Sequence, residues 1–453
     1  MIVANRRSLA AFALVLFMLA ALAAAQSPEE YQKRRQAVRS RMEPNSVLIL
    51  RGSERTGEGP FRQESNLFYL TGTKEPGTSL ILYAEASANE QQRAPGASAR
   101  PKEILFWTPP GVGAAETQKP PDKPGFETVR RSAEFQVYLD RVLLGNAPVV
   151  YLDYQRSRNL SGMLTADEEL LKRARDRGAS FAVRPTGMLI NPLRSIKSPA
   201  EIEILKTAAA ITAEALKEAM RSAGPGLYEY QLQSIIEYVF SFNGAPRPGF
   251  STIVGSGPNS CILHWSENTR QTMAGDVAVL DVGAEYWMYT ADITRTIPIS
   301  GTFTKRQRDI YDIVLQANQA AIEMVAPGAD MRDINNRVNT IMSDGLIKLG
   351  LIKDQRGLPK YYPHGLSHPI GLQVHDVGGL GKLATGMVIT IEPGLYLPEE
   401  DFGIRIEDDV VVTENGHDVI TSGVPKGAQE VEALMKQGSS LNFQRYLIKG
   451  TGK

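Results

Sequence analysis

The stretch LDVGAEYWMYTADITRT, residues 280–296, carries two aspartates in sequence that is otherwise typical of buried β-strands. Its flanks, VAVLDVG and TADITRTIPI, are rich in β-branched and apolar residues, and each contains one acid, Asp281 or Asp292. A buried carboxylate is costly unless it is paired or binds a cation. A spacing of eleven residues would put the two acids on opposite faces of one straight strand. Gly283 and the polar-aromatic residues after it instead predict a chain reversal that brings both acids to one side.

This stretch lies in a half of the chain that is built twice. Each copy contains two helical stretches joined by a Pro-Gly turn, at 225–226 in the first copy and at 327–328 in the second. Further along, GDVAVLDVG (275–283) parallels GMVITIEPG (386–394). The repeat predicts a pseudo-twofold domain whose polar residues converge on the interface between the copies.

The acids and histidines of the two copies fall at matching offsets. Asp281 and Glu392 both occupy the seventh position, counted from the glycine that opens each parallel stretch. His264 and His375 both precede that glycine by eleven residues. Agreement of both the acids and the histidines is harder to explain by chance than agreement at a single offset.

Each copy continues into another strand that carries an acid, Asp292 in the first copy and Glu407 in GIRIEDDVVV in the second. Strand alternation places Glu407 with Arg405 on one face, opposite Ile404 and Ile406. Four carboxylates therefore project from central strands toward a common region. They would repel one another strongly there unless cations intervene.

A histidine ligand is predicted in YYPHGLSHPIGLQVHDVGG. His364 and His368 are four residues apart, as in helical zinc motifs, but Gly365, Pro369 and Gly371 argue against a helix. No glutamate follows the first histidine, as HExxH would require. Because a residue before proline is normally extended, we expect His368 on a strand or loop.

One histidine and four acids favour hard or borderline divalent ions such as manganese over a thiolate-lined zinc site. There are more carboxylates than one metal needs, which indicates two metals that share bridging acids and lower the pKa of a bridging water. The alternative is that the acids form buried ion pairs with Arg295 and Arg405.

The first half of the chain predicts a separate α/β domain, residues 26–195. Strands are expected at SVLILRG, SNLFYLTG, TSLILYA, EILFWTPP and APVVYLDY, and helices at YQKRRQAVRSRM and ADEELLKRARDRG. This half contains no cluster of histidine or cysteine and no Gly-rich phosphate loop, so nothing in it predicts catalysis. The second domain, 196–437, opens on Ser198-Pro199-Ala200-Glu201, a capping box with proline at the first helical position. Residues 438–453 are expected to form a C-terminal tail.

The N-terminus has the pattern of a secretory signal peptide over residues 1–25. A basic start, MIVANRR, precedes an apolar run and the small residues Ala23-Ala24-Ala25, with cleavage expected before Gln26. We therefore expect an exported protein, periplasmic or secreted, with no membrane association beyond this segment. The alternative is an uncleaved anchor.

Composition bounds the remaining possibilities. A chain of 453 residues exceeds one ordinary core, so two domains are expected. The fifty basic and fifty acidic side chains cancel, which argues against a nucleic-acid-binding protein. A single cysteine excludes an intrachain disulfide.

Together these segments resemble the pita-bread metallopeptidases, and specifically the aminopeptidase P family. The motifs that carry the resemblance are STIVGSGPNSCILHWSENT, VLDVGAEYWMYTADITRTIPISGTFT, HGLSHPIGLQVHDVGG, GMVITIEPGLY and GIRIEDDVVVTENG, which span most of residues 198–437. PFRQESNLFYLTG, at 60–72, is similar to the α/β domain that precedes the catalytic domain in aminopeptidase P and prolidase. Methionine aminopeptidase lacks that domain.

The resemblance implies a role for each metal ligand. Asp281 would bind one metal, Asp292 and Glu407 would bridge two, and His368 and Glu392 would bind the other. The family's usual ion is manganese, with cobalt or zinc as substitutes. A bridging hydroxide would attack the scissile carbonyl while Glu392 shuttles the proton.

Four further residues would act around the reacting centre. His375 would stabilise the oxyanion by a hydrogen bond, and His264 would also face the reacting centre. His364 would help line the pocket for proline, and Arg405 would balance charge or touch the substrate. The implied activity is an Xaa-Pro aminopeptidase acting on proline-containing peptides, in a homo-oligomer that is a dimer or tetramer.

Three alternatives remain. Prolidase shares the fold, metals and ligands, and cleaves only Xaa-Pro dipeptides. A creatinase-like hydrolase has the fold without the metal ligands, which are present here. A non-catalytic binding protein on the same scaffold would be expected to have lost ligands, and none is missing.

Overall fold

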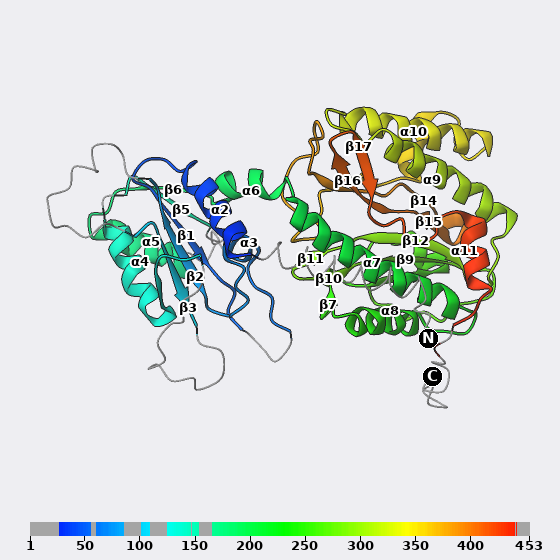
Figure 1. Cartoon of the computed structure of the whole chain (residues 1–453). Helices are drawn as coiled ribbons and strands as arrows, with labels where there is room; N and C mark the ends of the chain where they lie inside the picture. The colour runs from blue at the N-terminus through cyan, green and yellow to red at the C-terminus, as the bar shows by residue number, and fades with distance from the viewer. Residues whose placement is uncertain are drawn as a thin grey trace, which may run out of the picture. The chain divides into compact units, whose positions relative to one another are not determined.

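The structure is a computed structural model that describes residues 27–55, 60–85, 101–108, 125–145, 147–153, 165–439 and 441 (Figure 1). The chain forms two compact units, Met1–Arg194 and Ser195–Lys453. The predicted signal peptide, 1–25, lies outside the described residues, as does nearly all of the predicted tail, 438–453. No helix in the described ranges has both the length and the apolar composition needed to cross a bilayer.

The first unit is built on a six-stranded mixed sheet in the order β4-β3-β2-β1-β5-β6. Its strands are β1 Val47–Arg51, β2 Ser79–Tyr83, β3 Glu103–Trp107, β4 Val129–Arg131, β5 Val149–Leu152 and β6 Ala182–Arg184. Its α-helices are α2 Pro28–Arg39, α3 Ser65–Thr71, α4 Phe135–Leu144, α5 Ala166–Asp176 and α6 Gly187–Arg194. The sheet and helices α4 and α5 bury one apolar cluster, as an α/β domain requires.

One strand prediction in this unit is wrong, because SNLFYLTG forms helix α3, Ser65–Thr71. The Glu64 side chain accepts hydrogen bonds from the backbone N–H groups of Asn66 and Leu67 and so caps the start of the helix. Gly72 ends the helix in the left-handed region, at φ 67°. Nearly every residue of this short helix is buried, and its apolar run, Leu67 to Leu70, is too short for periodicity to distinguish a buried helix from a strand.

The second unit contains five α-helices among its described residues: α7 Pro199–Ser222, α8 Glu229–Phe242, α9 Lys305–Glu323, α10 Met331–Lys348 and α11 Ala428–Met435. Its strands are β7 Arg247–Pro248, β8 Ile253–Ser256, β9 Val277–Val282, β10 Ala284–Tyr286, β11 Tyr289–Thr290, β12 Ile293–Pro298, β13 Val388–Ile391, β14 Gly394–Leu397, β15 Phe402–Arg405, β16 Asp408–Thr413 and β17 Gly416–Val419. The predicted capping box is present, since the Ser198 hydroxyl accepts from the Glu201 N–H at the start of α7.

The predicted repeat is visible in the backbone of this unit. Helices α7 and α8 share one apolar cluster with strands β8, β9 and β12, and helices α9 and α10 share another with strands β13 and β16. The glycines of the two Pro-Gly turns, Gly226 and Gly328, have φ values of 92° and 84°. Those that open the parallel stretches, Gly275 and Gly386, have φ values of 90° and 88°. Corresponding glycines thus adopt the same left-handed conformation, which a side chain would disfavour.

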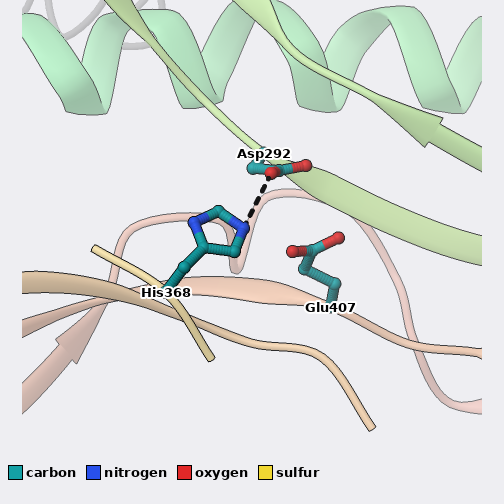
Figure 2. A group of neighbouring side chains, drawn as sticks. All are labelled: Asp292, His368 and Glu407. Carbon is teal, nitrogen blue, oxygen red and sulfur yellow. Dashed lines mark ion pairs between the residues drawn. The ribbon is translucent and has the colours of Figure 1, made fainter. Parts of the chain in front are cut away.

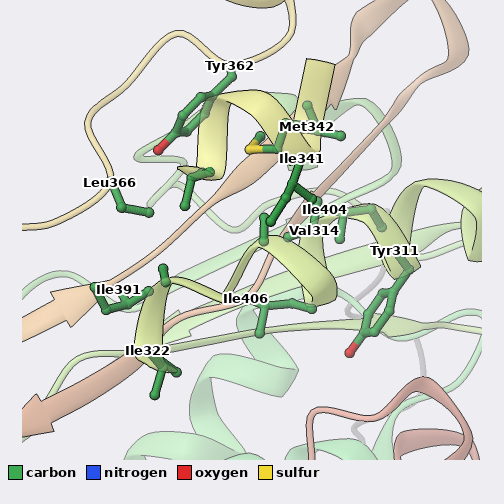
Figure 3. Close-up of a cluster of buried hydrophobic side chains, with 14 of the residues drawn as sticks. Tyr311, Val314, Ile322, Ile341, Met342, Tyr362, Leu366, Ile391, Ile404 and Ile406 are labelled. Atoms are coloured by element: carbon green, nitrogen blue, oxygen red, sulfur yellow. The ribbon is translucent and has the colours of Figure 1, made fainter. Parts of the chain in front are cut away.

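The helices of each copy cover the apolar side of that copy's strands. In the second copy, Ile391, Ile404 and Ile406 are fully buried against α9 and α10 (Figure 3). In the first copy, α7 and α8 cover β9 and β12 in a second cluster. Because side chains alternate along a strand, Arg405 and Glu407 point away from the isoleucine cluster, as the sequence predicted.

The chain reversal between the two aspartates is confirmed. Strands β9 and β12 pair antiparallel, with Thr294 opposite Asp281. The intervening residues fold back as β10 and β11, and Trp287 and Met288 occupy the turn with φ values of 49° and 71°. The two acids therefore lie at neighbouring positions of one hairpin.

Candidate metal centre

The five predicted ligands come from adjacent strand ends in the second unit. Asp281 lies on β9, Asp292 directly precedes β12, Glu392 directly follows β13, and Glu407 lies between β15 and β16. His368 lies in an extended segment beside β13, where its N–H donates to the Thr390 hydroxyl at 3.1 Å and its carbonyl accepts from the Thr390 N–H. The prediction that His368 is extended and not helical is confirmed.

These strand ends surround a pocket of about 510 Å³. All nine residues predicted for catalysis, substrate or metal line it: His264, Asp281, Asp292, His364, His368, His375, Glu392, Arg405 and Glu407. Its remaining lining residues are Phe250, Ser251, Ile253, Leu263, Ser266, Gly365, Ser367 and Val374. Side chains as far apart in the sequence as those of Phe250 and Glu407 thus share one cavity.

Three of the ligands form a compact group. Ligand atoms of Asp292, His368 and Glu407 all lie within 4.8 Å of one another (Figure 2). His368 Nε2 is 3.5 Å from Asp292 Oδ2 and 3.5 Å from Glu392 Oε1. The Nδ1 of His368 is 3.1 Å from the Pro369 carbonyl, which can only accept, so Nδ1 carries the proton. Nε2 therefore presents a lone pair to the acids, as a metal ligand must.

Two buried carboxylate oxygens at this site receive no hydrogen bond. Asp281 Oδ1 and Asp292 Oδ1 are inaccessible to solvent, and no donor among the described residues reaches them. Buried acceptors are normally satisfied, and leaving a charged one unpaired is costly. The donor set of carboxylate oxygens and one imidazole nitrogen fits a hard or borderline divalent cation.

Burial and mutual repulsion perturb the titration of these groups. Burial, followed by repulsion from Glu407 and Asp281, raises the pKa of Asp292 well above its ordinary value. Burial, followed by repulsion from Glu392 and Asp281, does the same to the pKa of Glu407. Burial raises the pKa of Glu392 to about 7 and lowers that of His368 to about 4. A bound cation would lower the pKa values of the three acids again, because it stabilises their ionised forms.

Comparisons with known proteins agree with this geometry. A model of metallopeptidase family M24 matches residues 203–414, and a model of the aminopeptidase P N-terminal domain matches residues 31–151. The Xaa-Pro aminopeptidase of Escherichia coli (strain K12) is 38% identical over 439 residues, covering 90% of this chain and 98% of that protein. The chain belongs to metallopeptidase family M24. It is accordingly a hydrolase with the fold of aminopeptidase P.

Solved M24 structures extend the likeness over both units. Zinc-substituted Escherichia coli aminopeptidase P in complex with product superposes with a TM-score of 0.78 at 34% identity, covering 92% of this chain and 99% of that one. Proline aminopeptidase P II from Yersinia pestis superposes with a TM-score of 0.79 at 33% identity, covering 91% of this chain and 100% of that one. The pita-bread fold and its preceding α/β domain are thereby confirmed.

Three histidines that are not predicted metal ligands, His264, His364 and His375, line the pocket of this M24 domain. His364 Nδ1 lies 2.8 Å from the Gly365 carbonyl, so Nδ1 holds the proton and Nε2 accepts from the Tyr396 hydroxyl at 2.9 Å. His375 is exposed, and its ring packs edge-on against the ring of His368, with 4.4 Å between the ring centroids. His264 is also exposed.

Sequence reasoning missed several polar residues that support the ligands. Tyr396 accepts from Arg405 Nη1 at 2.8 Å and thereby links Arg405 to His364. Thr294 donates to Glu407 Oε2 at 2.6 Å. Asp409 Oδ2 accepts the backbone N–H of Asp292 at 3.0 Å. The only sequence signal for these residues was their location on the strands that carry the ligands.

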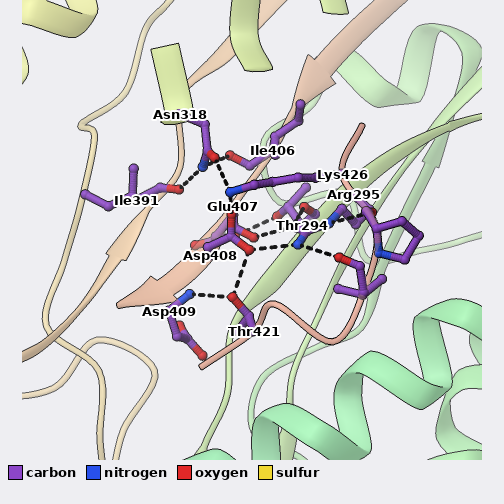
Figure 4. Close-up of polar contacts among 12 residues, drawn as sticks. Thr294, Arg295, Asn318, Ile391, Ile406, Glu407, Asp408, Asp409, Thr421 and Lys426 are labelled. Carbon is purple, nitrogen blue, oxygen red and sulfur yellow. Dashed lines mark hydrogen bonds and ion pairs between the residues drawn. The ribbon is translucent and has the colours of Figure 1, made fainter. Parts of the chain in front are cut away.

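The ion-pair alternative holds for one arginine and fails for the other. Arg405 Nη2 donates to Asp281 Oδ2 at 2.7 Å. Arg295 instead pairs with Asp408 at 2.7 Å, and Lys426 also contacts that carboxylate (Figure 4). Burial opposes ionisation of Asp408, but the two cations outweigh it and hold its pKa well below the usual range. Arg295 therefore does not offset the negative charge of the predicted metal ligands' carboxylates.

Proposed function

We propose that this chain is an Xaa-Pro aminopeptidase, which releases the first residue of peptides that have proline in second position. The observation that carries the proposal is the pair of buried oxygens, Asp281 Oδ1 and Asp292 Oδ1, which no described donor reaches, on two residues that line a pocket of about 510 Å³. Support also comes from a relative that bears this name and aligns over 90% of the chain.

The proposed cofactor is a pair of divalent metal ions, with manganese as the expected ion and cobalt or zinc as substitutes. Asp281 would hold one ion, Asp292 and Glu407 would be shared, and His368 and Glu392 would hold the other. Such ions polarise a carbonyl and lower the pKa of water, which supplies hydroxide near neutral pH for attack on the peptide bond.

The protein's own groups then carry the remaining steps. Glu392, which lines the pocket, would transfer a proton from the attacking water to the departing proline nitrogen. His375 and His264 face the pocket and would donate hydrogen bonds to the carbonyl oxygen as charge develops on it. Arg405 offsets the charge of Asp281, and His364 would contact the proline ring.

Proline in second position explains why a dedicated site is needed. An Xaa-Pro bond is a tertiary amide without an N–H group, and its ring restricts the backbone. Peptidases that recognise that N–H cannot bind the bond productively. A site that acts on the carbonyl and encloses the ring does not need the missing donor.

Export and oligomerisation complete the proposal. Support for export comes from the basic start, apolar run and small-residue cleavage pattern of residues 1–25. A homodimer or homotetramer is expected from the family resemblance. Sedimentation of the chain from Gln26 onward would test the oligomer, and N-terminal sequencing of the exported protein would test the cleavage.

The deciding experiment offers the chain from Gln26 onward three peptides in the presence of Mn²⁺: an Xaa-Pro dipeptide, an Xaa-Pro-Xaa tripeptide and an Xaa-Ala-Xaa tripeptide. Mass spectrometry follows each substrate. Release of the first residue from the proline tripeptide alone, or with the dipeptide, supports the proposal. Cleavage of the dipeptide alone would identify a prolidase. If neither the Xaa-Pro dipeptide nor the Xaa-Pro-Xaa tripeptide is cut, with bound metal verified, the result would favour a non-catalytic binding protein.

A further inference from the structure

Glu229 is a fully buried carboxylate in the first turn of α8, and five donors converge on it. Its Oε1 accepts from the N–H of Ser256 at 2.7 Å, from the Ser256 hydroxyl at 2.7 Å and from Asn259 Nδ2 at 3.0 Å. Its Oε2 accepts from Trp265 Nε1 at 2.9 Å and from the N–H of Arg270 at 3.0 Å. No basic side chain in the described part of the chain forms an ion pair with it, so hydrogen bonds offset the cost of its burial.

All these donors belong to one segment, residues 256–270, which leads from the end of β8 toward β9. The backbone N–H of Glu229 also donates to the Arg270 carbonyl at 2.9 Å. One side chain thus holds both ends of the segment and its middle. The segment contributes Leu263, His264 and Ser266 to the wall of the pocket.

His264 depends on this anchoring more than His364 and His368 depend on theirs. The rings of His364 and His368 each lie within hydrogen-bond distance of a backbone carbonyl, which orients them. The ring of His264 is exposed, and no group in the described ranges hydrogen-bonds to it. Its location is therefore set by its own backbone, and the next residue, Trp265, is tied directly to Glu229.

We propose that Glu229 is a positioning residue, which holds His264 at the reacting centre by anchoring the segment 256–270. The kinetic test of this inference rests on the peptidase function proposed above. Glu229 does not line the pocket, and among the wall residues of the segment, Leu263, His264 and Ser266, we assign its effect on the substrate to His264.

Glu229→Gln is the discriminating substitution. Glutamine has nearly the same shape, but its amide nitrogen is a donor, and both glutamate oxygens already face donors. Whichever way the amide turns, an N–H group must point at N–H or O–H groups of the segment. We expect the segment to shift while the fold is retained.

The kinetic test is a double-mutant cycle with E229Q and H264A, assayed on an Xaa-Pro-Xaa tripeptide with metal content measured. Misplacement of a reacting group by about 1 Å costs on the order of 100-fold in rate, so E229Q should lower kcat/KM by roughly 10- to 100-fold at unchanged metal content. In the H264A background E229Q should add little, because the residue through which it acts is gone. The inference would be overturned if the fold-losses in kcat/KM of the two single variants multiplied in the double variant, or if E229Q lost its metal.

A second readout does not depend on catalysis. The chain has five histidines, so the imidazole signals of His264 can be assigned in an NMR spectrum by their loss in H264A. E229Q should shift the His264 signals and leave those of His417 in place. Unchanged His264 signals would refute the positioning role. Failure of the wild-type chain to cut any proline peptide would refute the proposed function, while this spectrum still decides the role of Glu229.

Two further variants separate positioning from general destabilisation. Glu103→Gln changes another buried glutamate, which pairs with Arg35 in the first unit, and should lower stability without altering kcat/KM. If E229Q does not fold, Trp265→Phe removes one of the five hydrogen bonds and keeps an aromatic ring. It should lower kcat/KM in the same direction by a smaller factor, and full activity would count against the inference.

Discussion

Arg405 Nη2 donates to Asp281 Oδ2 over 2.7 Å, and the two residues come from different copies of the repeat. Arg405 lies on β15 and Asp281 on β9, and both are buried. The same guanidinium donates to Tyr396 and, through Nε, to Thr294 at 3.2 Å. One cation thus joins the copies, offsets one acidic charge and leaves the second oxygen of Asp281 available to a metal.

Arg405→Met should lower the free energy of unfolding by about 3–5 kcal/mol, because it leaves a buried carboxylate without its partner. Arg405→Lys should recover only part of this loss, since an ammonium group cannot reproduce the directed hydrogen bonds of the guanidinium to Asp281, Tyr396 and Thr294. Urea denaturation measures both. Arg332→Met, which removes an exposed ion pair with Asp330, is the control and should leave the transition unchanged. Equal curves for R405M and R332M would contradict the prediction.

Metal should stabilise the folded chain through the predicted ligands. At a free Mn²⁺ concentration about 100 times Kd, binding adds about 2.7 kcal/mol to the free energy of unfolding. Asp292→Asn should abolish most of the increase in melting temperature caused by Mn²⁺. Asp354→Asn alters an exposed acid paired with Arg356 and should preserve it. A full Mn²⁺ effect in D292N would remove Asp292 from the ligand set.

In the metal-free protein, Glu392 should contribute stability that is lost as the pH rises from about 4.5 to about 7, against an opposite contribution from His368, whose pKa burial lowers to about 4. Burial raises the pKa of Glu392 from 4.5 to about 7, so the folded state binds its proton more tightly than the unfolded state does. Folding is therefore favoured on the acid side of this window and loses that contribution as pH passes the folded-state pKa. Urea denaturation of chelator-treated protein across the window measures the slope.

Two results would check the cause of that slope. Glu392→Gln should flatten it, because the group that titrates has been removed. Saturating Mn²⁺ should reverse it, because metal binding requires the ionised acids and strengthens as they lose their protons. A slope unchanged by both would assign the pH dependence to other groups.

A buried ion pair next to His375 should be strongly coupled. Lys197 Nζ and Asp376 Oδ2 are 3.3 Å apart, and both side chains are almost fully enclosed. Lys197→Met or Asp376→Leu alone should cost about 3–5 kcal/mol in the free energy of unfolding. The double variant should recover much of this loss, because it leaves no unpaired charge. Additive losses would show that the pair is not coupled.

The sequence was sufficient for the repeat and for the residues that share the pocket. Matching offsets of Asp281 with Glu392 and of His264 with His375 predicted that both copies point polar groups at their interface. This inference works because a repeated segment folds in the same way twice, and the left-handed Gly275 and Gly386 confirm that it does. Strand alternation likewise predicted that Glu407 points away from the buried Ile404 and Ile406.

Partner choice needed the tertiary structure. Arg295 and Arg405 look alike in the sequence, yet Arg405 pairs with the carboxylate of a predicted ligand, Asp281, whereas Arg295 pairs with Asp408. The sequence also did not predict helix α3 or the hydrogen bonds that converge on Glu229. Periodicity reports which face of an element is buried, because burial depends on local alternation. It does not report which distant side chain lies across from a buried charge, since the packing of separate elements decides that.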